Sequence, residues 1–212
     1  MRDGARLRAE WHHPARPGTY PTLLMRVPYG FRGFGSAATA FAERGYNVLI
    51  EAVRGTGGSE GQFDPLTHER DDGLDTLDWI KAQPWFDGRL GTTGPSYLGY
   101  AQWAICDALP PQSAMSIKVS SAEFRSIVFP GGGLHLGLWL GWMQIIEGLR
   151  GNPWRFARKM SSGHVEQQTL TASMTLPLID ADKRATGHVV PFWKRWLGDA
   201  IGNDKFWEPL DH

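Results

Sequence analysis

The stretch Gly94-Pro95-Ser96-Tyr97-Leu98-Gly99 places a serine between a predicted strand at 89–93 and a predicted helix at 98–109. A serine at such a junction is a candidate nucleophile, because a tight strand-to-helix turn strains the residue and pushes its hydroxyl out above the sheet. Gly94 and Gly99 are small enough to let the strand and the helix approach each other closely. The stretch therefore predicts a nucleophilic serine at the end of a strand.

Two observations keep another interpretation of Ser96 open. The generic pattern around such a nucleophile has glycine two residues after the serine, and this chain has Leu98 there. Serine is also a common N-cap, whose side chain accepts a hydrogen bond from the first turn of a helix. Ser96 is thus interpreted as a nucleophile or, alternatively, as an ordinary turn or helix-cap serine.

Short apolar runs alternate with helical patterns along the first half of the chain. Strands are predicted at 6–11, 22–29, 46–53, 89–93 and 115–119, and helices at 36–44, 67–83 and 98–109. In the helix at 67–83, the predicted buried stripe is Leu74, Leu77 and Ile80. Strands that are apolar throughout are typical of a parallel sheet covered by helices on both faces, which binds ligands at the carboxyl ends of its strands. The predicted class is α/β, with a doubly wound, mostly parallel sheet and Ser96 at its ligand-binding edge.

The composition excludes several classes of partner. Of the 212 residues, 42% are hydrophobic and 21% charged, as in a soluble globular protein, and 22 Lys and Arg balance 22 Asp and Glu. No net field attracts nucleic acid or an anionic membrane surface, so neither is predicted as a partner. The single Cys106 excludes an intrachain disulfide and a cysteine-rich metal site. Neither the adjacent His12 and His13 nor His68 has the spacing of a metal-binding motif, so no metal and no cofactor are predicted.

The sequence predicts a cytoplasmic protein. No apolar stretch follows the N-terminal residues, so we find no secretory signal. The strongest apolar run, 134–146, is too short and too often interrupted by polar residues to cross a bilayer.

The chain changes character after Pro130-Gly131-Gly132-Gly133. No convincing strand pattern follows, and helices are predicted at 134–150 and 191–201. We therefore interpret residues 1–129 as the core of the α/β fold and residues 130–212 as a helical cap.

The cap region is rich in tryptophan. Core packing is the best explanation of each tryptophan taken singly, but as a group they are also suited to lining an apolar substrate pocket. Trp139 and Trp142, three residues apart on one predicted helix face, are the candidate substrate-binding residues.

Several short motifs occur in the first 110 residues or so. Their order and spacing, taken together, identify a protein family more specifically than any single motif does. They are Met1-Arg2-Asp3-Gly4, Met25-Arg26-Val27-Pro28-Tyr29-Gly30, Val53-Arg54-Gly55-Thr56-Gly57-Gly58-Ser59-Glu60-Gly61, Asp72-Gly73-Leu74-Asp75-Thr76, Gln83-Pro84-Trp85 and the Ser96 hexapeptide. Together they resemble the cocaine esterase and X-prolyl dipeptidyl peptidase family of α/β-hydrolases, which includes α-amino-acid ester hydrolases and acylases. In this family a glycine falls three residues after the nucleophile, which accounts for Gly99.

Carried over residue by residue, the resemblance implies that Ser96 is the nucleophile, that the backbone N–H of Tyr97 is one oxyanion donor and that the Tyr29 hydroxyl is the other. Tyr29 ends a predicted strand, so its phenol is expected over the same sheet edge as Ser96. One departure concerns Arg54, because the family commonly has an aspartate two residues upstream and this chain has Ala52. An ion-pair partner of Arg54 is therefore expected to be missing.

A serine nucleophile needs a histidine base and a carboxylate that orients it, and in α/β-hydrolases both follow the serine at the ends of later strands. The arrangement nearest to this order is Asp180 or Asp182 with His188, in a polar segment that we expect to be a solvated loop. His212, the last residue, is expected to fray. The triad acid and base are thus predicted to be absent. We interpret the chain as the N-terminal portion of a longer hydrolase, with a sheet that is incomplete on its C-terminal side.

The leading hypothesis is a serine hydrolase that cleaves a small-molecule ester, or an amide, through an acyl-enzyme at Ser96, and that is inactive as this chain alone. X-prolyl dipeptidyl peptidase and amino-acid ester hydrolase activities are alternatives within the family. A catalytically silent binding or interaction fragment is the alternative of another class. No oligomeric state is predicted.

Overall fold

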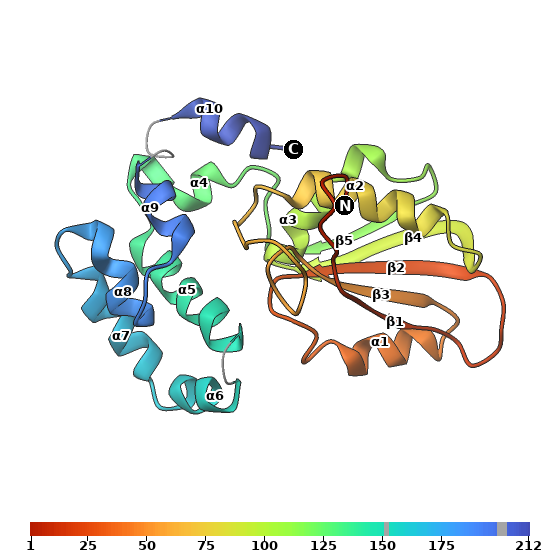
Figure 1. The fold of residues 1–212 in the computed structure, drawn as a ribbon, viewed down its shortest axis with the longest axis horizontal. Helices are drawn as coiled ribbons and strands as arrows, with labels where there is room; N and C mark the ends of the chain where they lie inside the picture. Colours follow the sequence, from red (N-terminus) through yellow and green to blue (C-terminus); the bar gives the residue numbers. More distant parts are fainter. Residues whose placement is uncertain (151–152, 199–202) are drawn as a thin grey trace. The chain divides into compact units, whose positions relative to one another are not determined.

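The chain folds as two units, the first of which contains the sheet. The computed structural model describes residues 1–150, 153–198 and 203–212 (Figure 1). Contacts group Met1–Ala122 with His212 in the first unit and Glu123–Asp211 in the second. None of the described helices is long and apolar enough to cross a membrane.

The first unit holds a mixed, mostly parallel sheet with the strand order β1-β3-β2-β4-β5 (Figure 1). Its strands are β1 (Ala9–His12), β2 (Tyr20–Val27), β3 (Asn47–Ala52), β4 (Phe86–Pro95) and β5 (Ala114–Lys118). β1 pairs antiparallel with β3, and the other neighbouring pairs are parallel. The predicted α/β class with a mostly parallel sheet is confirmed.

The parallel strands β2 to β5 overlap the strands predicted from apolar runs. The position of β1 differs from its prediction. Every residue of β3 is buried, as expected for a strand covered on both faces. β1 begins later than the predicted strand at 6–11, because Arg6 pairs instead with the glycine-rich loop before α2. There the Glu60 N–H donates to the Arg6 carbonyl at 2.9 Å, and the Arg6 guanidinium donates to the Glu60 carboxylate at 2.7 Å.

Two apolar clusters cover the two faces of the sheet. The helices of the first unit are α1 (Gly35–Ala42), α2 (Glu69–Lys81) and α3 (Tyr97–Trp103). From α2, Leu77 and Ile80 pack with Leu49 of β3, whereas Ala38 of α1 packs with the next residue of that strand, Ile50. Because successive side chains of a strand point to opposite faces, α1 and α2 lie on opposite sides of the sheet.

Two helices of the first unit differ from their predictions. Leu74 is only partly buried, and Asp72 and Thr76 occupy the buried face of α2 beside Leu77 and Ile80. The predicted helix at 98–109 ends as α3 at Trp103, and only a 3₁₀ turn, Cys106–Ala108, follows it. Polar side chains are thus part of the core of this unit.

The second unit is helical. Its helices are α4 (Arg125–Val128), α5 (Leu136–Arg150), α6 (Pro153–Ser161), α7 (His164–Ser173), α8 (Ala181–Thr186), α9 (Pro191–Gly198) and α10 (Asp204–Trp207), with 3₁₀ turns at Pro130–Gly132, Leu178–Asp180 and Glu208–Leu210. α5 and α9 overlap the predicted helices at 134–150 and 191–201, and positions 199–201 lie outside the described residues. The other helices have no counterpart in the sequence prediction.

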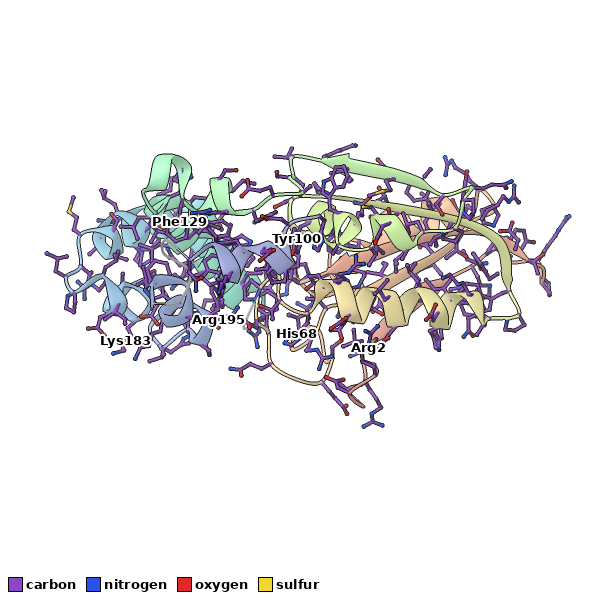
Figure 2. The ribbon with its side chains drawn as sticks, turned by 90° about the horizontal axis from the view of Figure 1, so that it is seen from above. Arg2, His68, Tyr100, Phe129, Lys183 and Arg195 are labelled. Atoms are coloured by element: carbon purple, nitrogen blue, oxygen red, sulfur yellow. The ribbon has the colours of Figure 1, made fainter. Side chains whose placement is uncertain are left out.

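The core of the second unit is aromatic. The ring of Trp139 packs edge-on against those of Trp142 and Trp196, with centroids 5.6 and 4.9 Å apart. Trp196 also contacts Trp207, at 6.5 Å. Arg195, labelled in Figure 2, lies with its guanidinium carbon 5.1 Å from the centre of the Phe206 ring. Core packing is therefore observed for Trp139, Trp193, Trp196 and Trp207, whereas Trp154 is exposed.

Candidate active site

Ser96 occupies a strained turn between β4 and α3. Its backbone has φ 57° and ψ −124°, a conformation that residues other than glycine rarely adopt. The side chain is exposed and makes no capping hydrogen bond to the helix that follows. The helix-cap interpretation of Ser96 is therefore not supported.

The two glycines of the hexapeptide are required by close approaches within the turn. A Cβ atom on Gly94, whose φ is 145°, would lie 2.4 Å from the Cβ of Leu98. One on Gly99 would lie 2.5 Å from the Cβ of Ser120, in the segment after β5. Leu98 itself is buried above Gly94, which explains why this position holds a large residue instead of the glycine of the generic pattern.

Hydrogen bonds fasten the turn to its surroundings. The Ser96 N–H donates to the Lys118 carbonyl of β5 at 2.9 Å, and the N–H groups of Gly99 and Tyr100 donate to the Ser96 carbonyl at 2.8 and 3.2 Å. The buried Gln102 side chain donates to the Gly94 carbonyl at 3.1 Å. The strained conformation is thus held by α3 and β5 together.

Tyr29 lies at the same edge of the sheet as Ser96. It follows the end of β2 by two residues, and β2 is the parallel neighbour of β4, with Leu24 opposite Thr92. The Tyr29 side chain is half-buried and packs against the apolar cluster that contains Val27. The topology that the prediction for Tyr29 requires is present.

Tyr97 is the first residue of α3, and its side chain is buried. The phenol hydroxyl donates to Glu69 Oε1 at 2.7 Å and accepts the Leu66 N–H at 3.0 Å. Burial, and next the Glu69 carboxylate, raise the pKa of the Tyr97 phenol well above its ordinary value of 10.0. The hydroxyl therefore remains protonated at neutral pH and is engaged with Glu69 and Leu66.

A buried group of charges lies behind this turn. Arg26 of β2 donates to Glu51 Oε1 of β3 at 2.8 Å and lies 3.0 Å from Glu69 Oε2 at the start of α2. The Thr76 hydroxyl donates to Glu51 Oε2 at 2.7 Å. The sequence analysis missed this group. Charged residues in the middle of the apolar runs at 22–29 and 46–53 are the signal that was available, because an unpaired charge is almost never buried.

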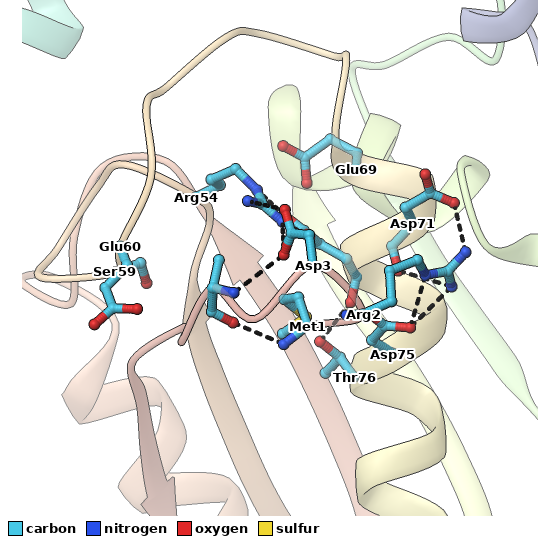
Figure 3. A network of polar contacts seen from close by, with 12 residues as sticks. Met1, Arg2, Asp3, Arg54, Ser59, Glu60, Glu69, Asp71, Asp75 and Thr76 are labelled. Carbon is cyan, nitrogen blue, oxygen red and sulfur yellow. Dashed lines mark hydrogen bonds and ion pairs between the residues drawn. The ribbon is translucent and has the colours of Figure 1, made fainter.

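Arg54 has two carboxylate partners, so the expectation that it lacks one is wrong. It donates to Asp72 Oδ1 of α2 at 2.5 Å. It also donates to Asp3 Oδ2 at 2.7 Å (Figure 3). Arg2 similarly reaches Asp71 and Asp75 of α2, at 2.9 and 2.8 Å. The N-terminal segment is thus fastened to α2 and to Arg54 by ion pairs.

A family model for the X-Pro dipeptidyl-peptidases (S15 family) matches residues 3–211. The chain belongs to this family. It is 32% identical, over 99% of its own length, to a cocaine esterase from Rhodococcus sp. (strain MB1 Bresler), of which it covers 39%. The chain therefore spans about two fifths of the length of this curated relative.

Solved structures show the same fold. An aminopeptidase from the marine sediment archaeon Thaumarchaeota archaeon superposes with a TM-score of 0.64 and 22% identity, covering 99% of this chain and 38% of that one. A CocE/NonD family hydrolase from Staphylococcus aureus gives a TM-score of 0.60 at 24% identity, over 72% of this chain and 32% of that one. The expected family and the α/β-hydrolase fold are confirmed.

The remaining candidate residues of this S15-family chain lie in the second unit. Trp139 is buried and Trp142 half-buried, both in the aromatic core. The expected solvated loop around Asp182 is wrong, because Asp182 lies in α8 and its fully buried carboxylate accepts the Val190 N–H at 2.8 Å. His188 Nε2 lies 2.9 Å from the Glu147 carboxylate and not beside Asp182.

His212 is held in place, contrary to the expectation that it frays. Its Nε2 lies 3.2 Å from the hydroxyl of Tyr100, on α3, and its N–H donates to the Ala122 carbonyl at 3.3 Å. Burial, and next the charge of Arg70, lower the pKa of the imidazole below its ordinary value of 6.5. Among the residues that the structure describes, no group of three or more His, Cys, Asp or Glu side chains is placed to hold a metal ion.

Proposed function

We propose that this chain carries the nucleophile and the oxyanion site of a cytoplasmic serine hydrolase that cleaves a small ester or amide. The observation that supports this most is the backbone of Ser96, at φ 57° and ψ −124°, with the side chain exposed directly after a parallel strand. That conformation is the strained turn in which α/β-hydrolases present their nucleophile.

In the proposed reaction the Ser96 hydroxyl attacks the carbonyl carbon of the substrate, and the carbonyl oxygen becomes an oxyanion. The Tyr97 N–H and the Tyr29 hydroxyl donate hydrogen bonds to this oxygen, because both belong to the carboxyl-end edge of neighbouring parallel strands. A base that this chain does not supply takes the proton of the Ser96 hydroxyl and passes it to the departing alcohol or amine as the bond from the carbonyl carbon breaks. An acyl-enzyme remains at Ser96, and water hydrolyses it to the free acid and the serine hydroxyl.

Trp139 and Trp142 remain the proposed residues for binding an apolar group of a substrate. Both belong to one face of α5. The indole N–H of Trp139 is buried, and no hydrogen-bond partner for it is found among the described residues.

We propose that this chain does not itself supply the base that would activate Ser96. Of the histidines after Ser96, His188 is engaged with Glu147 and His212 with Tyr100. Removal of the base from a serine triad lowers turnover by about a million-fold even when the oxyanion site survives. We therefore expect negligible hydrolysis by the 212-residue chain and slow but site-specific acylation of Ser96.

Covalent labelling tests this function without requiring turnover. The chain is incubated with a fluorophosphonate, with and without added imidazole as a substitute base, and the modified peptide is identified by mass spectrometry. We expect labelling at Ser96, accelerated by imidazole, and none in Ser96→Ala. Tyr29→Phe should slow the labelling by about 100- to 1000-fold, the usual loss for one oxyanion donor.

Labelling elsewhere, or none in a folded sample, would reject Ser96 as the nucleophile and favour a silent binding fragment.

A second experiment separates esterase from X-prolyl peptidase activity. It compares the hydrolysis of an aryl ester with that of a Xaa-Pro amide by a longer version of the chain. A hydrolysis rate that is higher for the ester, after correction for its greater intrinsic reactivity, supports the esterase.

A further inference from the structure

The residue after the nucleophile is fastened through its side chain to a buried carboxylate. Tyr97 is 3% exposed, and its hydroxyl donates to Glu69 Oε1 at 2.7 Å while accepting the Leu66 N–H at 3.0 Å. A hydrogen bond from a hydroxyl to a carboxylate at this distance is among the stronger kinds in proteins. The proposed chemistry at Ser96 uses neither the Tyr97 phenol nor Glu69.

Glu69 is itself fixed by Arg26. One guanidinium nitrogen of Arg26, Nη1, donates to the main-chain carbonyl of Glu69 at 2.6 Å and lies 3.0 Å from its Oε2. Arg26 and Glu69 are 2% and 4% exposed at their side chains. Arg26 also pairs with Glu51, so the anchor of Tyr97 is tied to two central strands, β2 and β3. Such buried charges are costly to desolvate, and a role in fixing geometry explains their presence.

We propose that Tyr97 and Glu69 are positioning residues for the Ser96 turn, because the bond between phenol and carboxylate fixes the rotation of the first residue of α3. The ring and the backbone N–H of Tyr97 share one Cα atom. A ring held at its far end therefore holds the direction of that N–H. The inference rests on the proposed function, in which this N–H donates to the oxyanion, and a donor acts there only if it is oriented beforehand.

The geometric part is tested by amide hydrogen exchange of the whole chain. Tyr97→Phe removes only the hydroxyl and keeps the ring and the N–H. We expect exchange of the Gly99 and Tyr100 amides, which donate to the Ser96 carbonyl, to accelerate at least about tenfold because the turn opens more often. Amides of β3 should be unaffected. Unchanged exchange at Gly99 and Tyr100 would overturn the inference.

Tyr20→Phe is the matched control. The Tyr20 hydroxyl donates to the Arg16 carbonyl at 3.0 Å. Tyr20 is the first residue of β2, so it lies at the opposite end of the parallel strands from Ser96. The same atom is removed, here from an exposed hydrogen bond to a main-chain carbonyl, and the Gly99 and Tyr100 amides should exchange as in the wild type. Equal acceleration in both variants would mean a general loss of stability and would also overturn the inference.

The kinetic part separates positioning from a merely structural role. Saturable fluorophosphonate labelling yields a binding constant and a maximal rate for Ser96. In Tyr97→Phe we expect the maximal rate to fall by about ten- to a hundredfold with the binding constant unchanged, as for a misplaced catalytic group. Glu69→Gln keeps an amide oxygen that accepts from the phenol, so its rate should fall less than that of Tyr97→Phe. A wild type that labels at Ser96 and a Tyr97→Phe variant that labels equally fast would reject positioning while keeping the proposed function.

Failure of the proposed function has a different signature. If the wild type is not labelled at Ser96, the nucleophile is rejected, and the exchange of Gly99 and Tyr100 still decides whether the phenol holds the turn.

Discussion

At the scale of single residues, the Asp3 carboxylate gives the clearest electrostatic prediction. The hydrogen bond from Arg54, and next the one from the Ala5 N–H, lower the pKa of Asp3 from 3.8 to about 2. Because the folded-state pKa is the lower one, ionised Asp3 stabilises the fold at neutral pH, and this stabilisation is lost as the pH falls from about 4 toward 2. Wild type should therefore be more stable than Asp3→Asn at pH 7, with a difference that shrinks between pH 4 and 2.

Urea unfolding at several pH values measures this difference. Asp78→Asn is the control, since Asp78 is exposed and its contact with Lys81 is longer, at 3.4 Å, within the same helix. Its effect on the free energy of unfolding should be smaller than that of Asp3→Asn. A difference between wild type and Asp3→Asn that stays constant down to pH 2 would contradict the role of the ion pair.

At the scale of elements, the turn between β4 and α3 predicts the cost of enlarging Gly99. An added Cβ would lie 2.5 Å from the Cβ of Ser120 and 2.8 Å from its Oγ. Overpacking of this kind costs about 1–3 kcal/mol, which exceeds the roughly 1 kcal/mol that alanine gains over glycine within a helix. Gly99→Ala should therefore lower the free energy of unfolding, and Ser120→Gly in the same chain should restore part of it.

The four variants of this pair form a double-mutant cycle, with stabilities measured by urea unfolding. Wild type, Gly99→Ala, Ser120→Gly and the double variant give the coupling between the two positions. We expect the double variant to be more stable than the two single effects added together. Additive effects would show that the clash lies elsewhere.

The same comparison of elements shows what sequence reasoning captures. Apolar runs bounded by turn residues correctly predicted β2, β3, β4 and β5. The hexapeptide correctly predicted that a strained serine follows the end of a strand. Helices α6, α7 and α8 of the second unit were missed, because their buried faces are short and include polar residues such as Asp182. Polar side chains enter a core only when distant partners satisfy them, and partners far apart in sequence leave no local periodic pattern.

The residues of the candidate site also divide into those that a local sequence motif reveals and those that only the fold brings together. Ser96 and its glycines form a local motif between a strand and a helix, so the sequence indicated them without reference to distant residues. The Arg26, Glu51 and Glu69 group joins β2, β3 and α2, and only the sheet topology brings these residues within hydrogen-bond distance. Arg54 was misjudged for the same reason, since its partners stand 18 and 51 positions away.

At the scale of the whole molecule, the two units have separate cores. The first is built on aliphatic clusters on either side of the sheet and the second on tryptophan rings. The sequence places a boundary at 129–130 and contacts place one at 122–123. Helix α4, which lies between these boundaries, is tied to α10 by an Arg125 to Asp204 ion pair at 2.5 Å. We propose that the units are two domains that unfold separately.

Arg26→Met tests this proposal, because it acts on the first unit alone. It leaves the Glu51 and Glu69 carboxylates buried without their cation, which costs about 3–5 kcal/mol. Amides of β2 and β3 should then exchange much faster, whereas those of α5 and α7 should keep their wild-type rates. The reciprocal variant, Trp196→Phe, removes part of a ring that is 1% exposed and packs on Trp139, and should act only on α5 and α9. If Arg26→Met accelerates exchange in α5 and β3 by the same factor, the chain unfolds as one cooperative body and the two-domain proposal fails.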